Sequence, residues 1–498
     1  MRREFYIAFV AAIVLNFIFY LAWPPGLYSL IFFIPFFALG FRDIRQHRHA
    51  IKSNFPVFGH FRYLLESIRP EINQYFIESN TDGKPFSREQ RSVVYQRAKK
   101  VLDTVPFGTQ HDVYEQGYEF VTHSLYPKHL SRKDLRVTIG SDLCKQPYSM
   151  SLLNISAMSF GSLSTASILA LNGGAKDGHF AHNTGEGGIS PYHLEPGGDL
   201  IWQIGTGYFG CRTHSGDFDP ELFKKNSSHP QVKMIELKLS QGAKPGHGGI
   251  LSGKKVTPEI AAIRNVPLGK DVISPPGHKA FSDAKGMLQF ISTLRELSGG
   301  KPVGFKFCLG HRQEFEELVA LMKELKLYPD FIVVDGAEGG TGAAPLEFTN
   351  YIGTPGMDAL VVVVDTLKKA GLKDQIKVIA TGKITTAFDI VKLLCIGADA
   401  TYAARSMMLA LGCIQALRCN NNKCPTGVAT QDPNLVKGLH VPTKRERVKN
   451  FHQETLESVA HMIGAMGVSH HSELRRHHLH KRVEENVIKT YAEIYTEA

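Results

Sequence analysis

Short apolar runs recur between residues 150 and 410, and each is bounded by Gly, Pro or Asp and alternates with helical stretches. They read LLNISAM, VKMIELKLS, DVISP, PVGFKFCLG, DFIVVDG, IKVIATG and DATYAARSM. Such units predict parallel strands whose C-terminal ends carry the functional residues. About eight units can be counted, which favours an α/β fold of the (β/α)8 TIM-barrel type over an open doubly wound sheet.

Composition narrows the class of protein further. The chain has 498 residues with 46 glycines and seven cysteines. The glycines are too many for an all-helical bundle, and the cysteines are too few for a secreted disulfide framework. The formal net charge of +10 suits either nucleic acid or an anionic membrane face, so its distribution has to decide.

Two apolar stretches stand at the N-terminus. Residues 5–23 contain no charged side chain, and residues 27–41 form a shorter stretch that contains Pro35. The first stretch is long enough to span a bilayer. A cleaved signal peptide is the alternative, but no small-x-small cleavage site precedes a polar start. We therefore expect a retained transmembrane hairpin at residues 1–41.

Basic residues flank this hairpin on both outer sides. Residues 1–52 carry six Lys and Arg against two acidic side chains, whereas the connecting WPPG carries none. By the positive-inside rule both ends are cytoplasmic. We expect the protein at the inner (cytoplasmic) membrane with its catalytic body on the cytoplasmic side, and we expect no nucleic-acid partner.

The rest of the chain divides into three predicted parts. Residues 42–139 are expected to form a helical connector, residues 140–440 the barrel with a cysteine loop, and residues 441–498 a basic helical segment. The histidines of SHHSELRRHHLH in that last segment are interpreted as a solvated helix face. The G-x-G-x-x-G match at residues 205–210 lacks a following amphipathic helix, so it predicts no dinucleotide site.

The sharpest local signal is a set of three cysteines, Cys413, Cys419 and Cys424, followed directly by Pro425. Soft thiolates match iron and sulfide, and three ligands favour a 3Fe-4S cluster. Ordinary buried thiols or a zinc site are the alternatives, although zinc sites use closer pairs and a fourth ligand. The remaining cysteines are expected to be core residues: Cys144, Cys211, Cys308 and Cys395.

A phosphate site is predicted at the end of the barrel. TGK at residues 381–383 ends one strand, a helix starts near Thr386, and residues 403–406 end the next strand. Loops after the seventh and eighth strands of a barrel form a phosphate cradle together with a helix N-terminus. The glycine run that contains Gly336 lets a planar ligand approach the backbone closely.

Six motifs follow one another along residues 140–470: ISAMSFGSLS, NTGEGG, KLSQGAKPGHGGIL, ISPPGH, GGTGAAP and the cysteine loop ending in CPTGVATQDP. In this order they resemble the motifs of the FMN and iron-sulfur domain of glutamate synthase. The apolar N-terminus and connector are similar to those of the short FMN-binding glutamate synthase family proteins. The resemblance implies a barrel that binds FMN and 2-oxoglutarate, with a 3Fe-4S cluster that delivers electrons.

The resemblance also implies roles in cofactor binding. Cys413, Cys419 and Cys424 would ligate the cluster, and Met158 and Ser159 would lie against the isoalloxazine. The phosphate would be held by Thr381, Gly382, Lys383, Ala404 and Arg405. A cation near the flavin N1–C2=O edge, where reduced flavin becomes anionic, would be Lys306.

Five further residues would handle the substrate. Lys238 and Gln241 would contact the flavin or the substrate. Lys244 and Arg264 would clamp the two carboxylates of a 2-oxo dicarboxylic acid through charge-assisted hydrogen bonds. Glu186 is the candidate for a proton-handling or ammonia-guiding carboxylate, and with Lys244 it forms the predicted catalytic pair.

The sequence departs from the family pattern in two respects. Glutamate synthases read GEGGQL where this chain reads GHGGIL, so His247 and Ile250 replace a carboxylate and an amide, which leaves the substrate open. We also expect neither the family's glutamine amidotransferase domain nor an NAD(P)H domain in this protein. We expect ammonia from elsewhere, including a separate amidotransferase, and electrons from a ferredoxin-like protein or reductase subunit.

Three hypotheses follow for the function. The first is reductive amination of a 2-oxo acid, with 2-oxoglutarate to L-glutamate as the family expectation. The second is a flavin-dependent dehydrogenase acting on another amino acid or N-substituted glutamate and coupled to membrane electron carriers, which His247 and Ile250 favour. The third is a non-catalytic membrane-tethered scaffold, which retention of the cluster cysteines and the site cations opposes.

Overall fold

The computed structural model describes residues 1–496. The chain divides into two compact units, of which the first is Met1–Ser79 and the second begins at Asn80.

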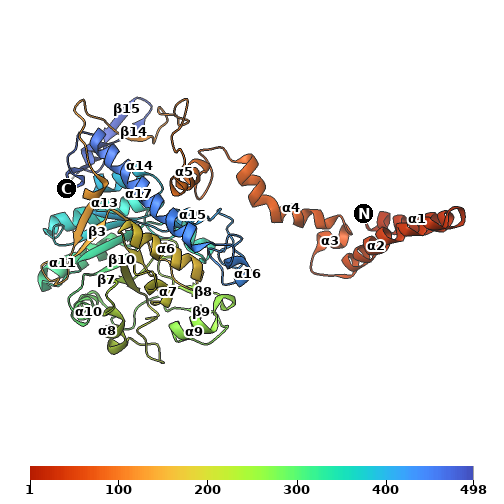
Figure 1. Cartoon of the computed structure of the whole chain (residues 1–498), viewed down its shortest axis with the longest axis horizontal. Coiled ribbons are helices and arrows are strands. Elements are labelled where there is room, and N and C mark those ends of the chain that lie inside the picture. Colours follow the sequence, from red (N-terminus) through yellow and green to blue (C-terminus); the bar gives the residue numbers. More distant parts are fainter. Residues whose placement is uncertain (497–498) are drawn as a thin grey trace. The chain divides into compact units, whose positions relative to one another are not determined.

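The first unit is helical and opens with an antiparallel pair (Figure 1). Helix α1 (Arg2–Ala22) stops before two prolines that cannot continue it, and the chain turns through the 3-10 helix η1 (Pro24–Ser29) into α2 (Leu30–Arg45). Phe5 of α1 packs its ring against Phe37 of α2, with 5.4 Å between the ring centroids. Both apolar segments are long and apolar enough to cross a membrane.

The unit continues beyond α2 in shorter helices. These are α3 (Ala50–Asn54), α4 (Gly59–Ile72) and the π-helix η2 (Asn73–Ile77). The buried carboxylate of Asp43 in α2 holds α4 and the turn before it, because it accepts hydrogen bonds from the backbone N–H of Val57 and from His60 Nε2, each at 2.9 Å.

The second unit contains a closed barrel of eight parallel strands, as predicted. In order around the barrel they are β4 (Leu153–Ile155), β5 (His182–Asn183), β6 (Leu200–Ile204), β7 (Val232–Lys238), β10 (Val303–Phe307), β11 (Phe331–Asp335), β12 (Lys377–Thr381) and β13 (Ala400–Ala403). Most of their residues are buried, because helices cover the outer face and side chains fill the interior.

Helices follow the strands, and the longer ones each bury one apolar face. They are α6 (Thr165–Gly178), α7 (Pro191–Leu194), α8 (Pro220–Ser227), α10 (Ala284–Leu297), α11 (Arg312–Leu325), α12 (Leu346–Tyr351), α13 (Gly356–Ala370), α14 (Ala387–Ile396), α15 (Arg405–Leu411) and α16 (Pro433–Val436). Helix α17 (Val441–Ala465) packs beside α6 and α14 (Figure 1).

One predicted strand lies outside the barrel. DVISP contains β9 (Val272–Ile273), which pairs antiparallel with β8 (Ile250–Leu251) in the long loop after β7. Ile273 is 68% exposed, so this run does not have the two buried faces of a barrel strand. The barrel uses β5 and β6 instead, neither of which was among the apolar runs. The same loop holds η4 (Gly253–Lys255) and α9 (Pro258–Arg264).

The predicted helical connector is helical only as far as Lys99. Helix α5 (Arg88–Lys99) begins with a capping box between Ser87 and Gln90. The described range 100–139 holds no α-helix, and it contains η3 (Arg132–Asp134), β1 (Glu119–Val121) and β2 (Arg136–Ile139). Strand β2 pairs with β3 (Tyr148–Ser151) just before the barrel.

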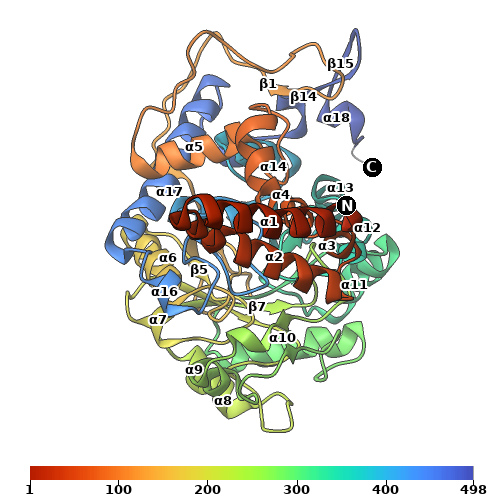
Figure 2. The ribbon, with the colours of Figure 1, turned by 90° about the vertical axis from the view of Figure 1, so that its right-hand side faces the viewer.

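The histidine-rich stretch is not the predicted helix face. It forms the 3-10 turns η5 (His471–Glu473) and η6 (Arg476–His478) and then enters β14 (Leu479–Glu484). This strand lies between β1 and β15 (Val487–Thr490), and α18 (Tyr491–Ile494) follows them (Figure 2). Arg476 is buried and pairs with Asp365 at 2.6 Å, so the stretch packs onto the barrel helices.

Candidate active site

The residues predicted to bind cofactor or substrate gather at the C-terminal ends of the barrel strands. Nearly all of them lie in a barrel strand or in the loop that follows it. In chain order they are Met158 and Ser159 (after β4), Glu186 (after β5), Lys238 (the last residue of β7), Gln241 and Lys244 (after β7), Lys306 (in β10), Gly336 (after β11), Thr381 (the last residue of β12), Gly382 and Lys383 (after β12), and Ala404 and Arg405 (after β13). Arg264 ends α9 and reaches the same rim. This is the face where barrel enzymes build their active sites.

Four charged side chains converge there. Glu186 Oε1 accepts a hydrogen bond from Lys238 Nζ at 2.8 Å, and the charges of Lys244 and Arg264 also act on this carboxylate. Two glycines border it closely, because a Cβ at Gly205 or Gly249 would lie 2.6 Å from a Glu186 oxygen and would force that side chain to shift. The local backbone is therefore built around this carboxylate.

Opposing forces set the protonation states of this cluster. Burial raises the pKa of Glu186, but Lys238, Lys244 and Arg264 outweigh burial and hold that pKa below its usual value. Burial lowers the pKa of Lys244 to about 8 and that of Arg264 to about 10. At neutral pH the cluster thus contains three cations and one carboxylate, a surplus of two positive charges.

Arg264 connects this cluster to the loop after β4. Its Nη2 donates to the carbonyl oxygen of Phe160 at 2.9 Å and to Ser159 Oγ at 3.3 Å. Its guanidinium carbon lies 5.2 Å from the centroid of the Phe209 ring. The Nε atom is buried and has no hydrogen-bond partner among the described residues. One donor of this cation therefore stays available in the site.

His278 holds Lys238 in place, a role that its motif ISPPGH did not reveal. Its Nε2 lies 2.9 Å from the Lys238 carbonyl oxygen and its Nδ1 lies 3.1 Å from the Tyr208 hydroxyl. Burial lowers the pKa of His278 to about 4, so the ring is neutral and donates through Nε2 while Nδ1 accepts. The backbone of Lys238 is fixed as a result.

A second charged group fills the barrel interior beneath the rim. Lys306 pairs with Asp335 at 3.2 Å, and Asp335 also accepts the backbone N–H of Gly242 at 3.0 Å. Burial lowers the pKa of Lys306, but Asp335 and Glu236 outweigh it and raise that pKa above its usual value. Lys306 is thus a fixed cation, and Asp335, which sequence reasoning missed, links it to the loop that carries Lys244.

Helices α14 and α15 begin shortly after β12 and β13, and only α14 has a side-chain cap. Helix α14 is closed by its own capping box of Thr386 and Asp389. Helix α15, in contrast, has no side-chain cap, and the hydroxyl of Ser406 is buried without a partner among the described residues. Arg405 donates to the Glu338 carbonyl oxygen at 2.7 Å, and its charge acts on Lys383. An uncapped helix start, the unpaired Ser406 hydroxyl and two cations thus lie together at this end of the barrel.

The three cysteines of the predicted cluster lie within electrostatic range of one another. The Tyr95 hydroxyl of α5 donates to the Cys413 carbonyl oxygen at 2.7 Å, and Cys424 Sγ lies 3.4 Å from the Thr426 hydroxyl. Among residues 1–496, no three His, Cys, Asp or Glu side chains are grouped closely enough to hold a metal ion. Of the other cysteines, three are buried and Cys144 is half-buried.

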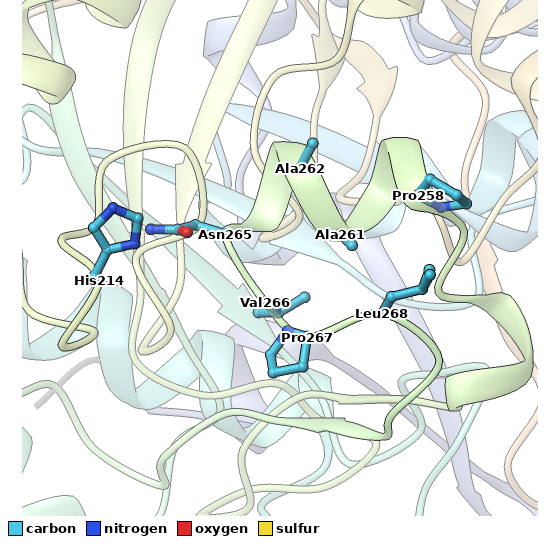
Figure 3. Close-up of a pocket in the computed structure, with 8 residues that line it drawn as sticks. All are labelled: His214, Pro258, Ala261, Ala262, Asn265, Val266, Pro267 and Leu268. Atoms are coloured by element: carbon cyan, nitrogen blue, oxygen red, sulfur yellow. The ribbon is translucent and has the colours of Figure 1, made fainter.

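One surface hollow, of about 610 Å³, lies outside this cluster (Figure 3). It borders the outer side of α9, where His214 faces Asn265, the residue after Arg264. A second hollow of about 480 Å³ is lined in part by His278. The predicted site residues line neither hollow.

Sequence comparisons identify relatives of this chain. A family profile described as the conserved region in glutamate synthase matches residues 109–469. The glutamate synthase large subunit-like protein YerD of Bacillus subtilis (strain 168) is 38% identical over 491 residues, 90% of this chain and 92% of that protein. The archaeal glutamate synthase (NADPH) of Methanocaldococcus jannaschii is 34% identical over 360 residues, 72% of this chain and 66% of that protein.

A solved structure with a similar arrangement is the recombinant flavin-binding domain of baker's yeast flavocytochrome b2. Its TM-score is 0.45 and its identity 12%, and the alignment covers 90% of this chain and 94% of that chain. The family profile matches most of the chain, and YerD aligns over nearly all of its length. The chain therefore belongs to the glutamate synthase family and is an oxidoreductase of that type.

Proposed function

We propose that the protein reductively aminates a 2-oxo acid, with 2-oxoglutarate to L-glutamate as the expected reaction, using FMN, an iron-sulfur cluster and an external electron donor. The observation that carries this proposal is the convergence of Lys238, Lys244 and Arg264 on Glu186 beside the Met158–Ser159 loop. A surplus of two positive charges matches a substrate with two carboxylates.

The rim also fits a flavin mononucleotide. The open start of α15, with Lys383 and Arg405 beside it, suits a phosphate, and Lys306 supplies a fixed cation below the rim. A bound flavin supplies two-electron redox chemistry, and an iron-sulfur cluster supplies single electrons to it. The phosphate ligands would be Thr381, Gly382, Lys383, Ala404 and Arg405.

The chain's own residues handle charge and protons in this reaction. A 2-oxo acid and ammonium, with two electrons and two protons, give an amino acid and water. Lys244, whose pKa is about 8, can give a proton to the carbonyl oxygen that leaves as water. Glu186 stays ionised and can hold ammonium or the new amino group by charge-assisted hydrogen bonds.

The reaction is tested with detergent-solubilised enzyme reduced anaerobically by one equivalent of dithionite. We expect flavin absorption to return only when 2-oxoglutarate and ammonium are both added, and 15N-ammonium to appear in L-glutamate by mass spectrometry. Each compound alone is the control. Reduced flavin that stays bleached with both compounds would contradict glutamate synthesis.

His247 favours a second candidate, a flavin-dependent dehydrogenase on another amino acid or N-substituted glutamate. Its ring packs edge-on against Phe348, with 5.2 Å between centroids, and Nδ1 donates to the Gly248 carbonyl oxygen at 2.9 Å. This places an imidazole where glutamate synthases have a carboxylate. Bleaching of the oxidised flavin by such an amino acid, without reoxidation by 2-oxoglutarate, would select this candidate.

We also propose that the first unit anchors the protein in the cytoplasmic membrane. Apolar side chains of α1 and α2 project outward, for example Phe17 at 61% exposure and Phe32 at 77%. Such a surface is costly in water and matches lipid. Basic residues gather at the outer ends of α1 and α2, which favours a cytoplasmic position for both ends.

The anchor predicts the behaviour of the full chain in membranes washed with alkaline carbonate. The native chain should remain in the membrane pellet. Placing arginine at two outward positions, Val14→Arg with Phe17→Arg, costs roughly 5–7 kcal/mol of insertion and should move most of the protein to the supernatant. Tyr28→Arg in the turn is the matched control and should stay in the pellet. A native chain released by carbonate would overturn the anchor.

The three cysteines are proposed to hold a 3Fe-4S cluster. Each iron of such a cluster takes its own thiolate, so the sulfur atoms stand farther apart than around a single ion. Among the described residues, no three His, Cys, Asp or Glu side chains lie close enough to hold a single metal ion, and a cluster with wider sulfur spacing does not need such a group. Burial of Cys424 and the mutual proximity of the three thiols support the proposal.

A further inference from the structure

Lys255 is a buried cation beside the cysteine loop. Only 4% of it is exposed, whereas its neighbour Lys254 is exposed. Its ammonium donates three hydrogen bonds to backbone carbonyl oxygens, of Ser162 at 3.0 Å, Cys419 at 2.8 Å and Ala429 at 2.9 Å. The three donors of the ammonium group are all used, so the side chain is held in one position.

Neutral oxygens surround this charge. Among the described residues Lys255 forms no ion pair with a carboxylate, and the ionisable side chains near enough to act on it are the thiols of Cys419 and Cys424. A buried ammonium without a counter-charge is unfavourable. A negatively charged group held by the cysteines would supply the missing counter-charge.

Lys255 also joins two loops with different predicted tasks. Ser162 belongs to the loop after β4 that carries the predicted flavin contact Ser159, and the hydroxyls of these serines are 3.0 Å apart. The cysteine loop provides the other two acceptors of Lys255. Gln431 donates to the carbonyl oxygens of Gly161 and Leu163, at 3.1 and 2.8 Å, and reinforces the same junction.

We propose that Lys255 is a positioning residue that neutralises charge on the cluster bound by the three cysteines, favours reduction of that cluster and holds it against the flavin side of the barrel. This inference rests on the proposed cluster. A cation fixed next to a cluster stabilises the added electron by Coulomb attraction, which is strong in a buried site.

The test is an EPR-monitored potentiometric titration of the full-length protein, with iron and FMN contents measured alongside. Lys255→Met should make one-electron reduction of the cluster about tenfold less favourable, a fall of about 59 mV in midpoint potential. Lys255→Gln keeps a donor but loses the charge, so it should show the same fall. Lys254→Met, at the exposed neighbour, should titrate like the native protein.

The outcomes separate this inference from the proposed cluster. A native protein without iron would overturn both. A native protein with the cluster, together with an unchanged midpoint in Lys255→Gln at full iron content, would overturn the role of Lys255 alone. If Lys255→Met fails to fold, Lys255→Gln decides, because a merely structural role would change its melting temperature without moving the potential.

Discussion

Arg264→Gln is expected to reduce the second-order rate of flavin reoxidation by 2-oxoglutarate and ammonium roughly 150- to 5,000-fold, because removing one partner from a buried charge cluster costs about 3–5 kcal/mol. The guanidinium is the site cation that contacts the Ser159 loop and keeps a free Nε donor. Its loss also removes one of the three cations around Glu186. The concentration of 2-oxoglutarate for half-maximal rate should rise together with the loss in rate.

Arg212→Gln is the matched control. Arg212 lies over the same Phe209 ring, at 5.5 Å, but the cations that chiefly lower the pKa of Glu186 are Lys238, Lys244 and Arg264. We expect native reoxidation rates and native FMN content in this variant. Arg264→Gln with a native rate and a native half-maximal concentration would show that the substrate carboxylates bind elsewhere.

Much of the fold could be predicted because barrel strands are buried on both faces and therefore stand out as continuous apolar runs. VKMIELKLS and IKVIATG contain β7 and β12 for this reason. Strand β5 could not be recognised, since it has two residues, His182 and Asn183, and both are polar. DVISP was misassigned because its apolar pair is too short to distinguish a barrel strand from an exposed hairpin.

The candidate site could be predicted where its residues follow strands along the chain. Lys238, Thr381 and Ala404 lie at strand ends as expected. Residues that act through tertiary contacts had no local signal. His278 reaches the carbonyl oxygen of Lys238 from the far end of the long loop that follows β7. Lys255 is buried although Lys254, the lysine before it, is exposed.

The histidine-rich stretch shows why charge pattern alone misleads. Its basic residues predict a solvated helix face, but His471 and Arg476 are buried. Arg476 is compatible with burial because Asp365 pairs with it at 2.6 Å, and that partner is more than a hundred residues away in the sequence. A long-range ion pair of this kind is invisible until the chain is folded.

Cys419→Ser is expected to remove the cluster and to leave the flavin in place. A serine hydroxyl is a hard, protonated donor at neutral pH and does not match iron-sulfur chemistry, so iron should fall from about three atoms per chain towards none. The EPR signal of the oxidised cluster should disappear with it. FMN should remain near its native content, because the predicted flavin contacts lie at the strand ends and not in the cysteine loop.

Cys144→Ser separates cluster loss from a general effect of losing a thiol. Cys144 is half-buried, and its Sγ donates to the Gly300 carbonyl oxygen at 3.4 Å, a hydrogen bond that a serine hydroxyl can replace. Iron and FMN should both stay at native levels in this control. With the cluster gone, Cys419→Ser should still reoxidise after direct chemical reduction of its flavin but should accept no electrons from a ferredoxin-like donor. Native iron in Cys419→Ser would contradict the assignment of the three cysteines, because a 3Fe-4S cluster needs a thiolate on each iron.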